Sequence, residues 1–241
     1  YGFLRDEARR VGAEVRSFGS AAGADAVLTG FAATQGGAAV RARLRGKDLE
    51  FPIRQAGAHW GPNSLCVLLM LEALDVDMDT GLAALAAFAP LEGRGAERIV
   101  RLAGGAFTLI DESYNANPIS MAAALSTLGA RSDGGRRIVA LTDMLELGED
   151  SPRYHQELAP AVDAAGADLV FAAGPLMKSL WDALPPTRRG GYAETAAELS
   201  PLVVQAIEPG DVVMVKGSLG SKAQAVAAAL AALDVGPGEG G

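Results

Sequence analysis

The chain has 241 residues, of which 49% are hydrophobic, and its formal net charge is -8. This length and hydrophobic content can bury one sizeable core or two modest ones, so we expect two compact domains. The acidic balance and the lack of a Lys/Arg-rich run argue against nucleic acid as the main ligand. No stretch reaches roughly 18 uninterrupted apolar residues and the N-terminus lacks a signal-peptide layout, so we expect no membrane span and a cytoplasmic location.

Two single residues carry further expectations. Cys66 is the lone cysteine, which excludes an internal disulfide, and its apolar neighbours favour a buried, inert thiol over a nucleophile. The first residue is Tyr1, within an amphipathic pattern, and we therefore expect that a natural N-terminal region precedes this chain.

The first part of the chain predicts a helix followed by an antiparallel meander. The helix is expected over residues 3–11 and strands over 14–18, 25–34, 38–45 and 48–53. Arg41, Arg43 and Arg45 alternate with apolar residues along one of these strands. A row of arginines could form an anion-binding site. Alternation of apolar and charged residues is also typical of a half-buried strand, and we favour the interpretation that these arginines face solvent.

Two helices complete this part, at residues 65–74 and 80–88. His59 and Asn63 flank the start of the first helix beside Pro62, where backbone N–H groups favour anions and polar ligands. A structural histidine is the alternative for His59. Asp77 and Asp79 are interpreted as caps, with the second helix capped by Asp79 or Thr80, and we assign no metal site.

A Gly- and Pro-rich segment at residues 89–98 marks the boundary between the expected domains. We expect the domains to be residues 1–96 and 97–235, followed by a flexible tail at 236–241. The tail fits G-x-G-x-x-G literally, but no strand precedes it and no helix follows it. Arg94 stands between two glycines, and its guanidinium either reaches a phosphate or is an exposed linker arginine.

Strand and helix alternate from residue 98 onward. A hairpin is expected over 99–102 and 107–111, further strands over 138–142, 168–173 and 211–216, and helices over 120–128, 152–165, 175–184, 195–207 and 222–233. This pattern predicts an α/β fold with a doubly wound, mainly parallel C-terminal sheet, preceded by a partial α/β domain that contains the antiparallel meander.

Polar segments follow four of these strands, at residues 114–118, 143–148, 174 and 216–220. Parallel topology brings all four to one edge of the sheet, which favours a binding site there. Asp111 beside the amides of Asn115 and Asn117 suits ribose hydroxyls or a base edge. The alternative is an Asx-rich turn that caps the helix starting near Pro118.

Two other motifs are weaker. Residues 217–222 contain glycines and a lysine but lack the P-loop spacing, although Lys216 and Ser218 could contact an anion. Neither His59 nor His155 lies in a nucleophile-elbow context, so no Ser/His/Asp triad is indicated.

Five segments recur in the order of one enzyme family. They are H-x-x-x-N at His59 and Asn63, G-R at Gly93 and Arg94, D-E-S-Y-N-A-N-P at 111–118, D-M-L-E-L-G at 143–148, and K-G-S at 216–218. In this combination the chain resembles the Mur ligases of bacterial cell-wall synthesis. It is most similar to those that join D-alanyl-D-alanine to UDP-N-acetylmuramoyl-tripeptide.

The resemblance implies an ATP-dependent ligase that forms an acyl phosphate, with ATP, Mg²⁺ and these two substrates as its partners. It implies Asn63, with His59 nearby, at the adenine and the pair Asp111 and Glu112 at the ribose. Arg94 would reach the terminal phosphate. Residues implied to wall the nucleotide are Tyr114, Asn115, Asn117 and Pro118, and those implied to lie near the dipeptide are Asp143, Lys216 and Ser218.

The sequence departs from the family pattern in two places and covers it incompletely. Trp60 stands where many relatives have asparagine, and Thr142 replaces a glycine. The family's P-loop, magnesium ligands and modified lysine are expected before Tyr1, so we expect the 241-residue chain to fold but not to ligate. The alternatives are a non-catalytic nucleotide-binding module and a related Mur or folylpolyglutamate-type ligase.

Overall fold

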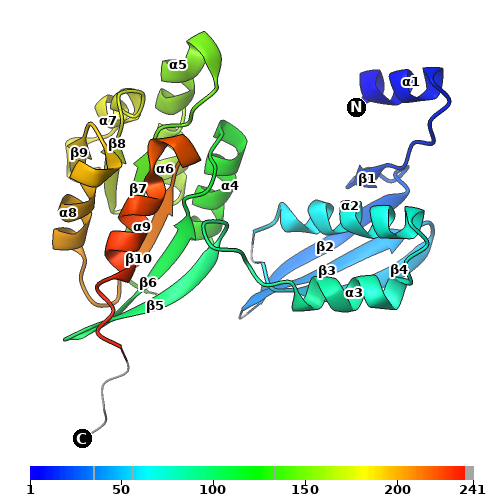
Figure 1. Ribbon diagram of the computed structural model, residues 1–241, viewed down its shortest axis with the longest axis horizontal. Coiled ribbons are helices and arrows are strands. Elements are labelled where there is room, and N and C mark those ends of the chain that lie inside the picture. The colour runs from blue at the N-terminus through cyan, green and yellow to red at the C-terminus, as the bar shows by residue number, and fades with distance from the viewer. Residues whose placement is uncertain (35, 56, 133, 237–241) are drawn as a thin grey trace, which may run out of the picture. The chain divides into compact units, whose positions relative to one another are not determined.

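The computed structural model describes residues 1–34, 36–55, 57–132 and 134–236. The chain forms two compact units, Tyr1–Ala89 and Pro90–Gly241, which we call unit 1 and unit 2 (Figure 1). The expected tail at 236–241 lies outside the described residues except for Gly236. None of the described helices is long and apolar enough to cross a bilayer.

Unit 1 is a four-stranded sheet packed against two helices (Figure 1). The strands follow the order β1 (Phe18–Gly19), β2 (Ala26–Thr34), β3 (Gly37–Leu44) and β4 (Lys47–Ile53). The two packed helices are α2 (Trp60–Ala73) and α3 (Met78–Ala87), whereas α1 (Gly2–Arg10) has no buried residue. The β2–β3–β4 meander is antiparallel, as expected. Val40, Ala42 and Leu44 are buried while Arg41, Arg43 and Arg45 are exposed, which confirms the solvated face.

Three details of unit 1 differ from expectation. Of the strand expected at 14–18, the last residue alone is in β1, because pairing with β2 is limited to Phe18 and Gly19. Helix α3 starts at Met78 rather than Thr80, and Asp77, one of the two aspartates interpreted as caps, is its N-cap and accepts from the Thr80 N–H at 3.0 Å. Cys66 is half-buried rather than fully buried.

Unit 2 contains a six-stranded sheet in the order β5-β6-β10-β7-β8-β9. Its strands are β5 (Ala96–Leu102), β6 (Gly105–Glu112), β7 (Arg137–Thr142), β8 (Leu169–Ala173), β9 (Arg189–Ala193) and β10 (Val212–Lys216). All neighbours are parallel except β5 and β6, which form the expected hairpin. The predicted mainly parallel sheet is thus confirmed.

Helices cover both faces of this sheet (Figure 1). Helices α4 (Pro118–Gly129), α5 (Ser151–Gln156), α6 (Ala159–Ala164) and α7 (Lys178–Ala183) lie on one face, and α8 (Ala196–Ala206) and α9 (Ala223–Ala231) lie on the other. Alternation along β6 divides its side chains, with Ile110 in the first core and Leu109 in the second. The alternation therefore decides which face each polar residue at the strand's end joins.

Two elements of unit 2 were predicted wrongly. The helix expected over 152–165 is two helices, because Pro160 has no N–H to donate and is accommodated in the first turn of α6. Strand β9 was missed because Gly190 and Gly191 are poor strand formers. A Cβ at Gly190 would lie 2.7 Å from the Phe171 ring, so the glycine allows close packing on β8.

The division between the units falls after Ala89, whereas we expected it after Ala96. The linker joins unit 2 because its backbone hydrogen bonds there: Gly95 N–H donates to Asp111 O at 2.8 Å, and Gly93 O accepts from Tyr114 N–H at 3.0 Å. Residues 90–95 are therefore part of unit 2 rather than a free connection.

Candidate functional site

The four polar segments expected at one sheet edge do meet there. Ser218 N–H donates to Asp143 O at 3.1 Å, and its Oγ accepts from Leu145 N–H at 3.0 Å and lies 3.3 Å from Ala116 O. Asp143 Oδ1 in turn accepts from Met177 N–H at 2.8 Å. These bonds join the loops after β6, β7, β8 and β10 into one cluster at the carboxyl ends of the strands.

The two neighbouring carboxylates of β6 face opposite sides of the sheet, because successive strand side chains alternate. Glu112 lies on the α4 face, where its Oε2 is 3.3 Å from Lys216 Nζ. Asp111 lies on the α9 face, where its oxygens accept from Gly93 N–H at 3.1 Å and Ser113 N–H at 3.0 Å. Each Asp111 oxygen keeps a second lone pair for a ligand.

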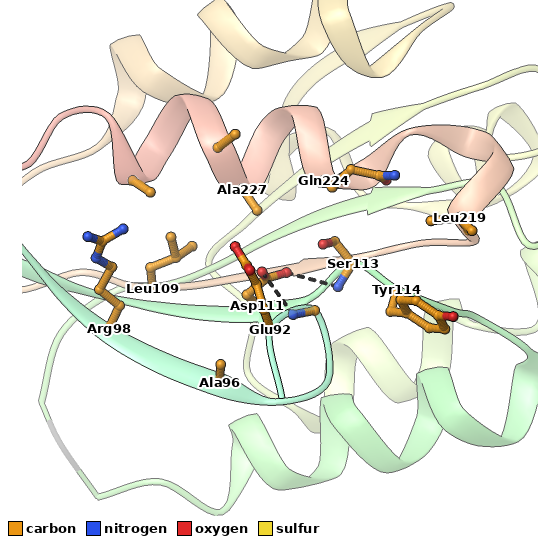
Figure 2. A pocket seen from close by; sticks show the side chains of 13 residues that line it. Glu92, Ala96, Arg98, Leu109, Asp111, Ser113, Tyr114, Leu219, Gln224 and Ala227 are labelled. Atoms are coloured by element: carbon orange, nitrogen blue, oxygen red, sulfur yellow. Dashed lines mark hydrogen bonds between the residues drawn. The ribbon is translucent and has the colours of Figure 1, made fainter. Parts of the chain in front are cut away.

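A cavity of about 450 Å³ lies beside Asp111, between α9 and the β5–β6 hairpin (Figure 2). The lining side chains on α9 are Gln224, Ala227, Ala228 and Ala231. Because most of them are alanines, the helix leaves room above Leu109 and Asp111. Figure 2 shows Tyr114 and Leu219 at one end and Arg98 at the other, with Asp111 and Glu92 between them. An apolar floor with carboxylates at its rim suits a flat ring that carries hydroxyl donors.

Arg94 packs on Tyr114 at the same end of the sheet. The Arg94 Cζ is 4.0 Å from the centroid of the Tyr114 ring, well inside the range of about 6 Å for a cation–π contact. Both side chains are exposed, and 44% of Tyr114 is accessible to solvent. From the sequence, Arg94 was interpreted as either a phosphate-binding residue or an exposed linker arginine. Its contact with Tyr114 was not predicted.

The amides after Tyr114 already have local partners. Asn117 is the N-cap of α4: its Oδ1 accepts from Ser120 N–H at 2.8 Å, and Ser120 Oγ accepts from Asn117 N–H at 3.0 Å. Asn115 Oδ1 accepts from Ala116 N–H at 2.9 Å, and Pro118 begins α4. The capping interpretation is confirmed for Asn117, and nucleotide contact by Asn115, Asn117 and Pro118 stays a prediction.

The three residues expected near the dipeptide are buried. Asp143, Lys216 and Ser218 are 5%, 2% and 6% exposed. The Lys216 ammonium donates to Asn115 O at 3.0 Å besides its bond to Glu112. Burial raises the pKa of Asp143, and the N–H groups of Met177 and Leu176 oppose that rise. These side chains hold loops together, and their direct contact with a substrate stays a prediction.

Sequence reasoning placed Gly174 at this edge, but it missed the contacts that Gly174, Thr142 and His155 make there. Gly174 has φ +111°, and a Cβ there would lie 2.4 Å from the Asp143 carboxylate. Thr142, the departure from the family glycine, is buried with its Oγ1 2.6 Å from Ser221 Oγ. His155 is buried, with Nδ1 2.6 Å from Ser151 O and Nε2 accepting from Met144 N–H at 2.9 Å. The tautomer with its proton on Nδ1 satisfies both of these hydrogen bonds.

The remaining candidates, His59 and Asn63, lie in unit 1. Asn63 is exposed on the first turn of α2, and His59 is exposed immediately before it, as expected from Pro62. The His59 and Trp60 rings are 5.6 Å apart, and Trp60 also packs on Phe88 at 6.4 Å. Trp60 therefore presents a ring where the family pattern has an amide.

No group of three or more His, Cys, Asp or Glu side chains in the described ranges could hold a metal ion.

An open, mainly parallel sheet with polar loops gathered at its carboxyl edge is the arrangement that α/β ligand-binding domains use. A family model described as "Mur ligase, glutamate ligase domain" matches residues 97–219, and the chain belongs to this family. The resemblance inferred from the motifs is confirmed at that level.

The chain is similar to several proteins named UDP-N-acetylmuramoyl-tripeptide--D-alanyl-D-alanine ligase. It is 30% identical to that of Rickettsia prowazekii over 179 residues, 74% of this chain and 39% of the relative. It is 30% identical to that of Mycobacterium tuberculosis over 217 residues, 80% of this chain and 42% of the relative. The chain thus spans about two fifths of the length of these relatives.

A solved structure shares the fold. The MurF ligase from Thermotoga maritima in complex with ADP matches with a TM-score of 0.77 and 20% identity, over 96% of this chain and 51% of that one.

Proposed function

We propose that this chain is part of an ATP-dependent ligase that joins D-alanyl-D-alanine to UDP-N-acetylmuramoyl-tripeptide through an acyl phosphate. The observation that carries the proposal is the cavity at Asp111, in a chain whose named relatives have this activity and whose structural neighbour was solved with ADP. Unit 1 is assigned to the end of the ATP-binding domain and unit 2 to the C-terminal domain. Because ATP and the nucleotide-linked substrate occur in the cytoplasm, we also assign the protein to that compartment.

The ribose contact is assigned to Asp111 rather than Glu112. Asp111 lines the cavity and has unused lone pairs, whereas Glu112 is on the other face and is paired with Lys216. Carboxylate oxygens accept from vicinal hydroxyls in fixed directions, so Asp111 would orient the sugar. Tyr114 lines the same cavity beside it.

The phosphate contact is assigned to Arg94, and the adenine contact in unit 1 to Asn63 with His59 beside it. A guanidinium offers several donors in one plane, which suits the charge that develops on the terminal phosphoryl group. Mg²⁺, when bound, would neutralise charge on the phosphates, and we assign none of its ligands to the residues named here. Asp143, Lys216 and Ser218 are assigned to shaping the loops beside the dipeptide.

The reaction is tested with the natural full-length protein, ATP and the two substrates, with the product identified by mass. The proposal predicts a pentapeptide product with D-alanyl-D-alanine and none with single amino acids or with folate and glutamate. A product from glutamate would favour a folylpolyglutamate-type ligase, and nucleotide binding without any product would favour a non-catalytic module.

The ribose assignment is tested with 2′,3′-dideoxy-ATP. Removing both hydroxyls should weaken binding to the natural protein about tenfold or more, since hydrogen bonds to a charged group contribute about 1.5–3 kcal/mol. Asp111→Asn should bind ATP more weakly and discriminate less between the two nucleotides. Equal binding of both nucleotides by the natural protein would refute the assignment to Asp111.

A further inference from the structure

The contact between Arg94 and Tyr114 orients a cation without using its donors. Arg94 has neither an ion pair nor a side-chain hydrogen bond in the described parts of the chain. The N–H groups of a guanidinium lie in its plane, and the contact of its Cζ with an aromatic ring pairs none of them with an acceptor oxygen. A carboxylate partner would have held the same group by occupying those donors.

The backbone around the pair is held by Asp111. Its carboxylate accepts from Gly93 N–H at 3.1 Å on one segment and Ser113 N–H at 3.0 Å on the other. Gly93 has φ +72°, and a Cβ there would lie 3.1 Å from the Tyr114 Cβ. The segments bearing Arg94 and Tyr114 are therefore fastened together, and the guanidinium contacts the Tyr114 ring between them.

A second stack in unit 2 provides a contrast. The Arg153 Cζ lies 4.6 Å from the Tyr154 ring centroid. Arg153 also donates to Glu157 at 2.8 Å and to Asp150 at 3.1 Å. Both pairs place an arginine Cζ over a tyrosine ring. Since the Arg153 donors are occupied by carboxylates, Arg153 has less capacity to bind an anion than Arg94.

We propose that Tyr114 is a positioning residue that acts through Arg94: its ring presents the guanidinium with free donors at the end of the Asp111 cavity. This inference rests on the proposed contact of Arg94 with the terminal phosphate. Tyr114 affects phosphate binding through the arginine, and the aromatic ring rather than the hydroxyl is the required group.

The test measures ATP kinetics of the natural full-length protein and its variants. Tyr114→Leu should lower kcat/KM for ATP about three- to fivefold, the size of an exposed cation–π contact. Tyr114→Phe should recover most of that loss. Arg94→Ala should lower kcat/KM about a hundredfold, and adding Tyr114→Leu to it should change the value less than about 1.5-fold. The matched control, Tyr154→Leu, should stay within about 1.5-fold of the natural protein.

A binding measurement separates positioning from a contact with the nucleoside. Tyr114→Leu should weaken a non-hydrolysable ATP analogue about threefold more than it weakens ADP, since ADP lacks the terminal phosphate. An undiminished Tyr114→Leu effect in the Arg94→Ala background, or an equal loss for ADP, would overturn the inference.

The outcomes also separate this inference from the proposed function. If Arg94→Ala is impaired but Tyr114→Leu is not, the inference fails and the phosphate assignment stands. If Arg94→Ala has normal ATP kinetics, both the phosphate assignment and the inference fail. The product assay and the dideoxy-ATP test still judge the ligase activity and the ribose contact.

Discussion

The carboxyl edge of the unit 2 sheet has two layers of polar side chains. In the inner layer, Asp143, Lys216 and Ser218 are at most 6% exposed and bond to neighbouring loops. In the outer layer, Arg94 and Tyr114 are exposed, and the Arg94 Cζ lies over the Tyr114 ring. Residue types that suit ligands occur in both layers, so burial and partners, rather than chemistry alone, separate support from contact.

The largest effect should come from breaking the inner layer at Gly174. Gly174→Ala should lower the free energy of unfolding by about 3 kcal/mol or more, because backbone strain at φ +111° adds to a clash with the buried Asp143 carboxylate. Urea unfolding followed by Trp181 fluorescence in a Trp60→Phe background measures unit 2.

The matched control for that change is Gly210→Ala. Gly210 has φ +93°, but a Cβ there would meet nothing within 4 Å. The control should therefore cost about 1–2 kcal/mol from strain alone. Equal losses at the two glycines would mean that the Asp143 contact does not constrain residue 174.

A smaller loss is expected from Lys216→Met. Removing the ammonium leaves Glu112 and the Asn115 carbonyl without their buried donor, which should cost about 2–3 kcal/mol because Glu112 keeps some contact with water. Lys178→Met, which removes an exposed pair with Asp182, should cost less than about 0.5 kcal/mol. If Lys216→Met were as stable as the natural chain, Lys216 would not support the inner layer.

The next comparison is at Asn117, an exposed residue that belongs to neither layer and caps α4. Asn117→Ala should cost about 1 kcal/mol, and Thr195→Ala, which removes the equivalent cap of α8, should cost a similar amount. If Asn117 also walls the nucleotide, its substitution alone should weaken ATP binding to the full-length protein. Equal ATP affinity in the two variants would leave Asn117 as a cap only.

The smallest effect should be a pH dependence at Asp143, because burial and hydrogen bonds act on its pKa in opposite directions. The pKa of Asp143 is raised in the folded state. The stability that Asp143 contributes is therefore present below the ordinary aspartate pKa of about 3.9, and it is lost as pH rises through the pKa of the folded state. The stability advantage of the natural chain over Asp143→Asn should therefore shrink as pH rises.

Asp25 provides the comparison of opposite sign. Hydrogen bonds from the Ser17 N–H and hydroxyl lower the pKa of Asp25, so its contribution is present above the ordinary value and lost as pH falls through the folded one. The advantage over Asp25→Asn should grow as pH rises, measured by Trp60 fluorescence in a Trp181→Phe background. The same trend for both variants would contradict the assigned causes.

Much of the fold could be predicted from the sequence, because the patterns that indicate buried strands and helices span only a few neighbouring residues. The antiparallel meander, the alternating strands of unit 2 and the meeting of four loops were all predicted this way. Strand β9 was not predicted because its glycines are explained by close packing on Phe171, which belongs to another strand.

The site was less predictable for the same reason. Motifs indicated Asp111 and Arg94, but not that strand alternation would send Asp111 and Glu112 to opposite faces of a sheet with different neighbours. Nor does a lysine in a K-G-S motif reveal that its ammonium is buried under a loop about a hundred residues earlier.

The reversed direction of β5 has a consequence for how the chain enters unit 2. Because β5 is antiparallel to β6, with Ala96 opposite Asp111, its first residue lies at the carboxyl edge of the parallel strands. A parallel first strand would have started at the opposite edge. The incoming polypeptide therefore delivers Arg94 to the ligand loops before any strand of unit 2 begins, and a displacement transmitted along the backbone from residue 89 would reach that arginine first.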